Sequence, residues 1–216
     1  MYESKNPLRP VMILLFLFVS IAGVGAQDVQ FDRKPLDAFA DQLKSLIEAK
    51  QVSFEDKFRV RMVARFTPKG RFDPKSIRWI LEEGENPKAV ELAKRALLAI
   101  DESGFSVYLG DLDVQEVDME LVQDGEWFRW KLGLSQSTRE RARSFAISLR
   151  SFISVIEMVE ARERRFLGDD GKAILRALKV DSEANIVRLR FEMSNDDLYP
   201  MVERNILFID RENSDK

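Results

Sequence analysis

Apolar residues recur along this chain with two different periods, and the period assigns each segment to a helix or a strand. Between residues 36 and 50 they return every three or four positions, which predicts an amphipathic helix. From Phe58 to Phe66 every second residue is apolar, which is typical of a half-buried strand. Thr67-Pro68-Lys69-Gly70 then has the composition of a tight turn. We therefore expect a hairpin whose return strand carries Ile77, Trp79 and Leu81 on one side.

A second helix follows the hairpin. Asn86 can cap it with its side chain, and Pro87 suits the first helical position. Its apolar residues, from Val90 onwards, keep helical spacing until Gly104, which favours a helix end. A short strand is expected at Phe105 to Leu109. The first unit of the chain is thus predicted to have the order α-β-β-α-β.

The second unit begins with a hairpin. Asp124-Gly125 is typical of the two central residues of a type I′ turn. That turn predicts a register in which Met119 lies opposite Trp130, Asp118 opposite Lys131 and Glu120 opposite Arg129. Trp127 would lie opposite Val122 on the charged face, as an exposed aromatic side chain close to the turn.

Helices dominate the remainder of the second unit. Ser137 and Glu140 have the spacing of a capping box ahead of a long apolar stripe, which predicts the longest helix of the chain, ending before Gly168. A short helix at 172–178, a last strand at 187–193 and a closing helix complete the unit. Pro200 fits that closing helix only if its cap lies near Asp197. The expected order is β-β-α-α-β-α.

These elements predict an α+β fold with antiparallel sheet or sheets and helices on one side. The expected organisation is a leader at 1–26, a first unit at 27–110, a second unit at 111–209 packed on the first, and a disordered tail at 210–216. The pattern leaves open whether the two units form one continuous sheet.

The N-terminal segment has the features of a secretory signal peptide. Lys5 and Arg9 precede a nearly unbroken apolar run from Val11 to Val24, and small residues end at Ala26. We expect cleavage between Ala26 and Gln27. An uncleaved anchor is the alternative, but the run of about 16 residues is shorter than the roughly 20 that span a bilayer as a helix. The expected location is the periplasm or the exterior of a bacterium, with membrane contact only through an uncleaved leader.

Composition restricts the chemistry further. The 216 residues include no histidine and no cysteine, which excludes histidine-based triads, catalytic cysteines and ordinary zinc sites. The net charge of −3 argues against nucleic acid as a partner. Asp111, Asp113, Glu116 and Asp118 form the densest acidic group, which could bind Ca²⁺ but lacks EF-hand spacing. We expect no metal, no cofactor and no enzymatic activity.

One segment resembles a known family. Phe58 to Ile100 combines the alternating strand, the Thr-Pro-Lys-Gly turn, a second strand ending in Glu-Gly-x-Asn-Pro and a helix rich in small residues. In these features residues 36–110 resemble the C-terminal domain of TonB and TolA, periplasmic proteins of the cell envelope. The resemblance implies α-β-β-α-β order and an envelope location. It does not imply energy coupling, because only Gln27 to Lys34 separates the leader from the first helix, where those proteins have a long spacer.

Two function classes remain. The first is an exported, non-enzymatic module that binds another envelope protein, with Arg59, Arg61, Arg65, Arg78 and Trp127 as its candidate surface. The same arginines could instead form a solvated sheet face balanced by neighbouring acids. The second class is a carrier that encloses a lipid or another apolar small molecule between the sheet and its helices. The regular apolar stripes suit a filled core better than a cavity, so the first class is favoured.

Overall fold

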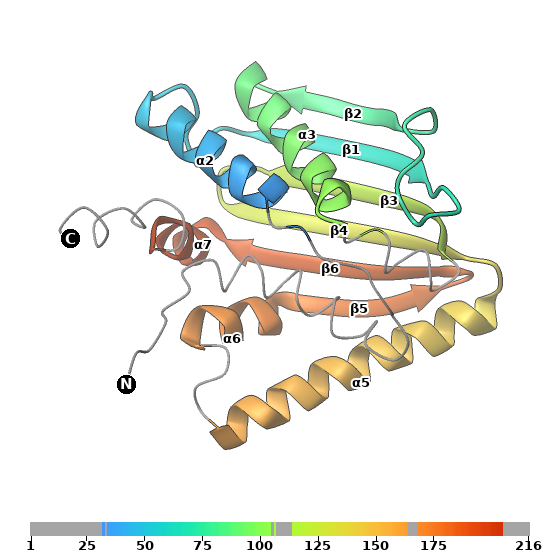
Figure 1. Cartoon of the computed structure of the whole chain (residues 1–216). Helices are drawn as coiled ribbons and strands as arrows, with labels where there is room; N and C mark the ends of the chain where they lie inside the picture. The colour runs from blue at the N-terminus through green and yellow to red at the C-terminus, as the bar shows by residue number, and fades with distance from the viewer. Residues whose placement is uncertain (1–31, 33, 105, 107–113, 164–167, 205–216) are drawn as a thin grey trace.

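The computed structural model describes the chain except residues 1–31, 33, 105, 107–113, 164–167 and 205–216. Its strands form a six-stranded antiparallel sheet in the order β2-β1-β3-β4-β6-β5 (Figure 1). The strands are β1 Phe58–Arg65, β2 Arg78–Gly84, β3 Val114–Gln123, β4 Trp127–Gln136, β5 Leu178–Glu183 and β6 Ile186–Ser194. The predicted α+β class is confirmed.

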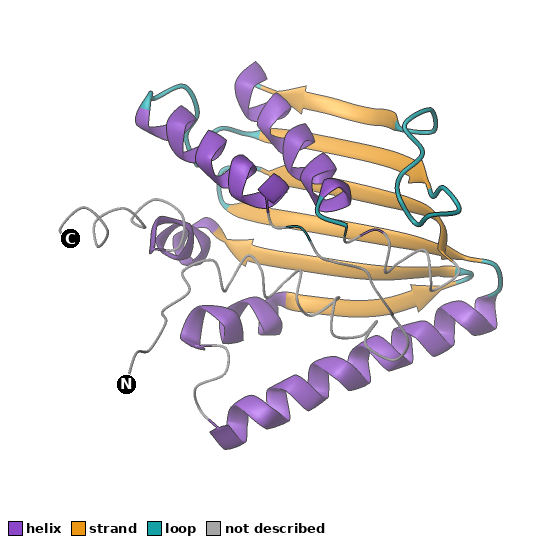
Figure 2. Ribbon diagram, viewed as in Figure 1, coloured by secondary structure: helices purple, strands orange, loops and turns teal. Residues whose placement is uncertain are grey.

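The described helices lie on one side of this sheet (Figure 2). They are α2 Lys34–Glu48, α3 Pro87–Glu102, α5 Arg139–Glu163, α6 Gly168–Ala177 and α7 Asn195–Val202. Helix α3 packs on β1 and β2, α5 packs on β5 and β6, and α2 packs against α3. None of the described helices is long and apolar enough to cross a membrane. The leader, its cleavage position at Ala26 and Gln27, and the tail at 210–216 lie outside the described residues.

The two predicted units share one sheet. Strand β1 is paired with β2 on one side and with β3 on the other, so that Met62 lies between Trp79 and Met119. The question that the sequence left open is therefore answered by strand pairing. The strand expected at Phe105 to Leu109 falls on residues that are not described, apart from Ser106, which is helical.

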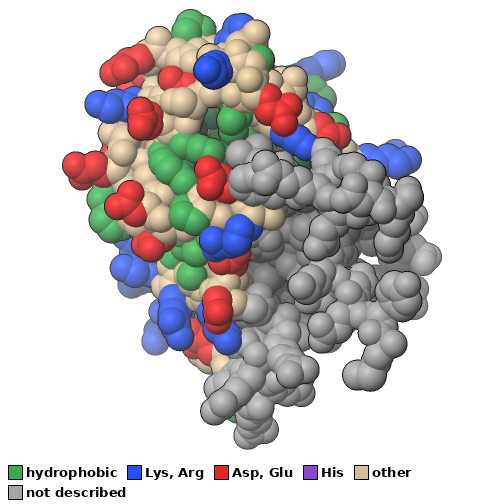
Figure 3. Space-filling model, turned by 90° about the vertical axis from the view of Figure 1, so that its left-hand side faces the viewer, with side chains coloured by type: hydrophobic (Ala, Val, Ile, Leu, Met, Phe, Trp, Pro, Cys, Tyr) green, Lys and Arg blue, Asp and Glu red, His purple; other side chains and the backbone are tan. Residues whose placement is uncertain are grey.

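The core between the sheet and the helices is filled by side chains from both units. Met62, Met119, Leu132 and Leu189 of the sheet and Leu149 of α5 are almost wholly buried. Between α2 and α3 a smaller cluster forms around Val52, Ala89 and Leu92. Figure 3 views the surface of the molecule from the left-hand side of Figure 1. A band of hydrophobic side chains on this surface is bordered by charged side chains of both signs.

The predicted register of the second hairpin is wrong by two residues. Met119 lies opposite Leu132, and Leu121 lies opposite Trp130. Gly125, with φ of +97°, is the first central residue of the turn rather than the second. The Asp124 side chain accepts hydrogen bonds from the backbone N–H groups of Glu126 and Trp127, at 3.0 and 2.8 Å, which stabilises this register. A shift of two residues leaves every side chain on its predicted face.

The end of the second unit contains a strand that the sequence analysis missed. Residues 178–183 form β5, which pairs with β6 through a tight turn at Ala184 and Asn185. The preceding helix α6 consequently runs from Gly168 to Ala177 instead of over 172–178. Only Leu178 and Val180 of β5 are buried, so its alternation is too short to distinguish it from a helix end.

Helix ends supply two further corrections. Thr138, not Ser137, caps α5, because its hydroxyl accepts from the Arg141 N–H at 3.2 Å. The cap of α7 is Ser194, whose hydroxyl accepts from the Asp197 N–H, whereas the sequence analysis places the cap near Asp197 itself. On α3, Glu91 pairs with Lys94, and Arg95 pairs with Glu102. The cap at Asn86 and the proline start are as predicted.

Candidate functional site

The most distinctive surface is the sheet face opposite the helices. Side chains alternate across each strand, so burying one face against the helices sends the other residues outwards. On this open face the central strands carry charged residues at successive outward positions. They include Arg59, Arg61 and Arg65 on β1, Glu116, Asp118 and Glu120 on β3, Arg129 and Lys131 on β4, and Arg188, Arg190 and Glu192 on β6.

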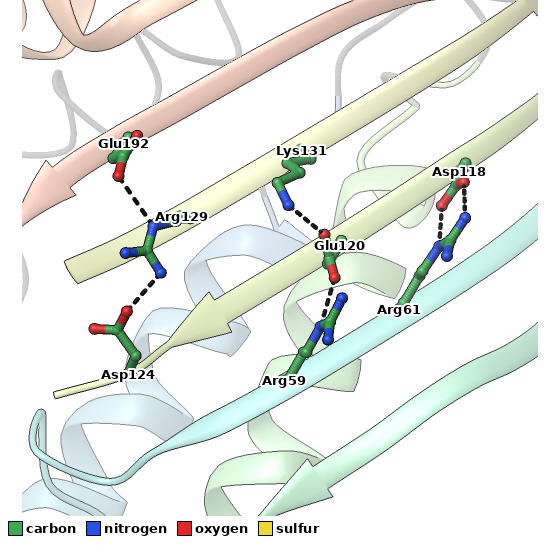
Figure 4. Close-up of polar contacts among 8 residues, drawn as sticks. All are labelled: Arg59, Arg61, Asp118, Glu120, Asp124, Arg129, Lys131 and Glu192. Carbon is green, nitrogen blue, oxygen red and sulfur yellow. Dashed lines mark hydrogen bonds and ion pairs between the residues drawn. The ribbon is translucent and has the colours of Figure 1, made fainter.

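Glu120 is the centre of this face. Its carboxylate accepts from Arg59 Nε at 2.7 Å and from Lys131 Nζ at 2.9 Å, one donor from each neighbouring strand (Figure 4). The residue is only 7% exposed, although it belongs to the open face. Burial favours the protonated acid, but the hydrogen bonds and charges of Lys131 and Arg59 outweigh it and lower the pKa of Glu120. Glu120 is therefore a carboxylate held ionised between two strands.

Arg61 and Asp118 form the best-oriented ion pair on this surface. Arg61 Nε and Nη2 donate to the two oxygens of Asp118 at 2.9 and 2.6 Å, a bidentate contact between β1 and β3 (Figure 4). The hydrogen bond to Asp118 raises the pKa of Arg61. Arg65 is more loosely paired, with 3.8 Å between its Nε and a Glu116 oxygen.

Ion pairs between side chains continue across the open face towards β5. Arg129 donates to Glu192 of β6 at 3.0 Å and to Asp124 at 2.5 Å (Figure 4). Arg188 donates to Glu183, and Arg190 donates to Asp181. The open face is therefore a mosaic in which carboxylates neutralise most cations locally. Such a mosaic does not form the broad cationic platform that binding of an anionic envelope polymer would require.

Strand β2 breaks this pattern through a β-bulge. The register shifts between Arg61 and Met62, so Arg61 pairs with Leu81 while Met62 pairs with Trp79, and Ile80 is the extra residue. Opposed residues of an antiparallel pair share a face, which places Leu81 on the open face with Arg61. The expectation that Ile77, Trp79 and Leu81 share one side is therefore wrong for Leu81. The sequence signal for this bulge is the run of three successive apolar residues at 79–81. A regular strand alternates between its two faces, so it cannot place all three on the buried face.

The bulge creates an apolar margin beside the ion pairs. Ile80 is 44% exposed, and Leu81 does not pack against the main core. Arg78 lies on the same strand opposite Val63, and no carboxylate of the described residues lies within ion-pair distance of it. We call Arg61, Arg78, Ile80 and Leu81 the β2 margin. It combines an exposed isoleucine and a half-buried leucine with Arg78, which has no ion-pair partner in the described part of the chain.

The candidate residues predicted from the sequence fall into two places. Arg59, Arg61 and Arg65 follow one another on β1, and Arg78 lies on the adjacent β2. Trp127, at 39% exposure, is exposed as predicted, but it pairs with Ser194 at the start of β4 and not with Val122. Strand β3 separates β4 from β1, so Trp127 is not part of the β2 margin.

The other candidate sites in the described structure have less support than the β2 margin. A shallow, open depression lies at the far end of the first hairpin, lined by Thr67, Lys69, Arg71, Phe72, Pro74, Asp101 and Glu102. Within the described ranges no cluster of acidic residues has metal-site geometry. Of the acidic group considered for Ca²⁺, Glu116 and Asp118 contact Arg65 and Arg61, while Asp111 and Asp113 lie outside the described residues. Among the described residues the core between the sheet and the helices is filled by apolar side chains, and the carrier hypothesis stays a prediction.

Comparison with known proteins adds no identification: no protein-family model, no curated protein and no solved structure matches this chain.

Proposed function

We propose that this protein is an exported, non-enzymatic interaction module of the bacterial cell envelope, and that the β2 margin binds a partner protein. The observation that carries the proposal is the exposed Ile80 next to the half-buried Leu81 and beside Arg78, on a sheet face whose other cations are largely paired. Arginine next to apolar groups is a common composition of protein interfaces.

The position of β2 also supports this function. It is an outer strand of the sheet, so one side of its backbone has no partner strand among the described elements. An outer strand can accept an extended segment of another protein through its unpaired N–H and C=O groups. Ile80 and Leu81 would then provide apolar contacts, and Arg78 would select a segment with an acidic residue. The resemblance of residues 36–110 to the TonB and TolA domains is consistent with such a role in the periplasm.

Photo-crosslinking in intact cells tests the proposal. A crosslinking amino acid replaces Ile80, and the matched control replaces Arg188, which is exposed on the same face near the opposite edge. We expect a discrete protein adduct from position 80 and none from position 188. Arg78→Glu, which removes an exposed cation without a described ion pair, should abolish the adduct while the protein stays folded. Identical adducts from both positions, or no adduct from position 80, would refute the proposal.

A further inference from the structure

Helix α5 has an outward face of unusual composition. Ile147, Val155 and Met158 are 48%, 53% and 53% exposed, whereas Ala142 and Ala146 on the opposite side are fully buried. The helical period places these three exposed residues on one side of α5. The exposed positions between them are occupied by Ser144, Ser148, Ser151 and Ser154. The outward-facing side chains of residues 144–158 are thus mostly aliphatic or small. This stretch of helix is about 22 Å long.

Charge is nearly absent from this stretch. Arg139, Glu140, Arg141 and Arg143 crowd the start of α5, but among the exposed residues of 144–158 only Arg150 and Glu157 are charged. They are seven residues apart, which is about two helical turns, so both lie on the same flank of the outward face. A water-facing helix surface usually carries more charge than this.

We propose that this face of α5 binds a second copy of the chain, with the two α5 helices antiparallel about a two-fold axis. In a two-fold interface each surface must complement itself. Ile147 would contact Met158 of the partner subunit, and Ser151 would contact Ser154 of the partner subunit. Serine side chains are small, which allows two helix backbones to approach closely.

The two flanking charges favour the antiparallel orientation. In an antiparallel pair with two-fold symmetry, the same flank of each helix lies on the same side of the interface, and the two flanks run in opposite directions. Arg150 therefore comes close to Glu157 of the partner subunit, and the reciprocal contact forms at the same time. A parallel pair related by a two-fold axis along the helices would instead place these flanks on opposite sides of the interface, where Arg150 and Glu157 could not pair with each other. The proposal does not involve the β2 margin, so it can fail or hold independently of the proposed function.

Single-cysteine crosslinking tests the arrangement directly, because the sequence has no cysteine of its own. Full-length Ile147→Cys and Met158→Cys chains are mixed and oxidised. The mixed disulfide dimer should form readily, since the two positions face each other. Ile147→Cys alone should crosslink poorly, because the proposed register separates that residue from its own symmetry mate by about 16 Å along the axis, far beyond the roughly 4.4–6.8 Å between Cα atoms of a disulfide. Efficient crosslinking of Ile147→Cys with itself would overturn the antiparallel arrangement.

Charge reversal provides the second test, by sedimentation velocity. Arg150→Glu removes both ion pairs of the dimer and adds repulsion, so it should weaken self-association by at least about tenfold. Arg150→Glu combined with Glu157→Arg should restore the association, because the reciprocal pairs reform. Circular dichroism confirms that each variant is folded. A wild-type chain that remains monomeric up to about 0.1 mM, or a double variant that is no stronger than the single one, would overturn the proposal.

Discussion

Tyr199 of α7 stacks its ring on Phe54, with 4.6 Å between the ring centroids, and donates its hydroxyl hydrogen to the Phe54 carbonyl oxygen. Gln123, at the end of β3, donates from Nε2 to the same carbonyl at 2.7 Å and to the Tyr199 hydroxyl at 2.6 Å. The contact joins the loop before β1 to the last described helix. Through Gln123 it also fastens this loop and α7 to the end of β3, a central strand of the sheet.

Tyr199→Phe should lower the free energy of unfolding by about 1–2 kcal/mol, because it removes two hydrogen bonds from a partly buried cluster and keeps the ring. Urea denaturation measures the change. Tyr199→Leu, which also removes the ring stacking, is the matched comparison and should cost more. Equal losses in the two variants would mean that the hydroxyl contributes the whole effect.

The same residue predicts an alkaline transition. Burial raises the pKa of Tyr199 from 10.0 to about 12, despite the hydrogen bond from Gln123. Folding therefore favours the neutral phenol: its contribution to stability is intact below pH 10 and is lost as the pH rises towards 12. Ultraviolet absorbance titration of wild type minus Tyr199→Phe should show one tyrosinate transition near pH 12. If the difference between the two titrations instead shows a tyrosinate transition near the ordinary pKa of 10.0, the Tyr199 hydroxyl is not buried as described.

Glu120 makes the opposite contribution, at acidic pH. Its folded pKa is lower than the ordinary 4.5, so the unfolded chain binds the proton more readily. The stabilisation is complete above that ordinary value and is lost as the pH falls through the lowered folded pKa. Glu120→Gln should therefore reduce the dependence of the free energy of unfolding on pH between 5 and 3, as measured by urea titrations. Glu192→Gln, a more exposed acid on the same face, is the control and should change this dependence less.

The two tryptophans of β4 should differ sharply in their contribution to stability. Trp130 is 8% exposed and Trp127 is 39% exposed. Trp130→Ala should cost about 3–5 kcal/mol of unfolding free energy, as expected for truncation of a large buried side chain. Trp127→Ala should cost less than about 1 kcal/mol. Chemical denaturation of both variants checks the assignment, and similar losses would place β4 with the wrong face towards the helices.

Gly84 should not tolerate a side chain. A Cβ at this position would lie 2.6 Å from Val90 Cγ2 and 3.0 Å from the Lys57 carbonyl oxygen. Gly84→Ala should therefore destabilise the protein by about 1–3 kcal/mol, since either the strand or α3 must shift. Gly133→Ala is the matched control, because its nearest contact would be an ordinary 3.5 Å from Asp118 Cβ. Thermal unfolding should separate the two, and a neutral Gly84→Ala would show that α3 can move away from β2.

Local signals in the sequence determined most of the secondary structure. Strand β1 and helices α2 and α3 follow from apolar period, a proline turn and the Asn86 cap, because these features act over a few neighbouring residues. The sequence also identified Arg59, Arg61, Arg65, Arg78 and Trp127 as outward-facing, since alternation fixes the face of each strand residue. Alternation survives an error of two residues in register, which is why the faces of the second hairpin were correct and its pairs were not.

Tertiary structure alone decided what these elements form together. The pairing of β1 with β3 joins segments more than fifty residues apart, and no local pattern selects that neighbour. Strand β5 exists because β6 offers it a hydrogen-bonding edge, although its own alternation is brief. The bulge at Ile80 depends on the fit of β2 to β1, and it creates the β2 margin. Such features depend on contacts between distant segments, whose free energy appears only when the whole sheet has assembled.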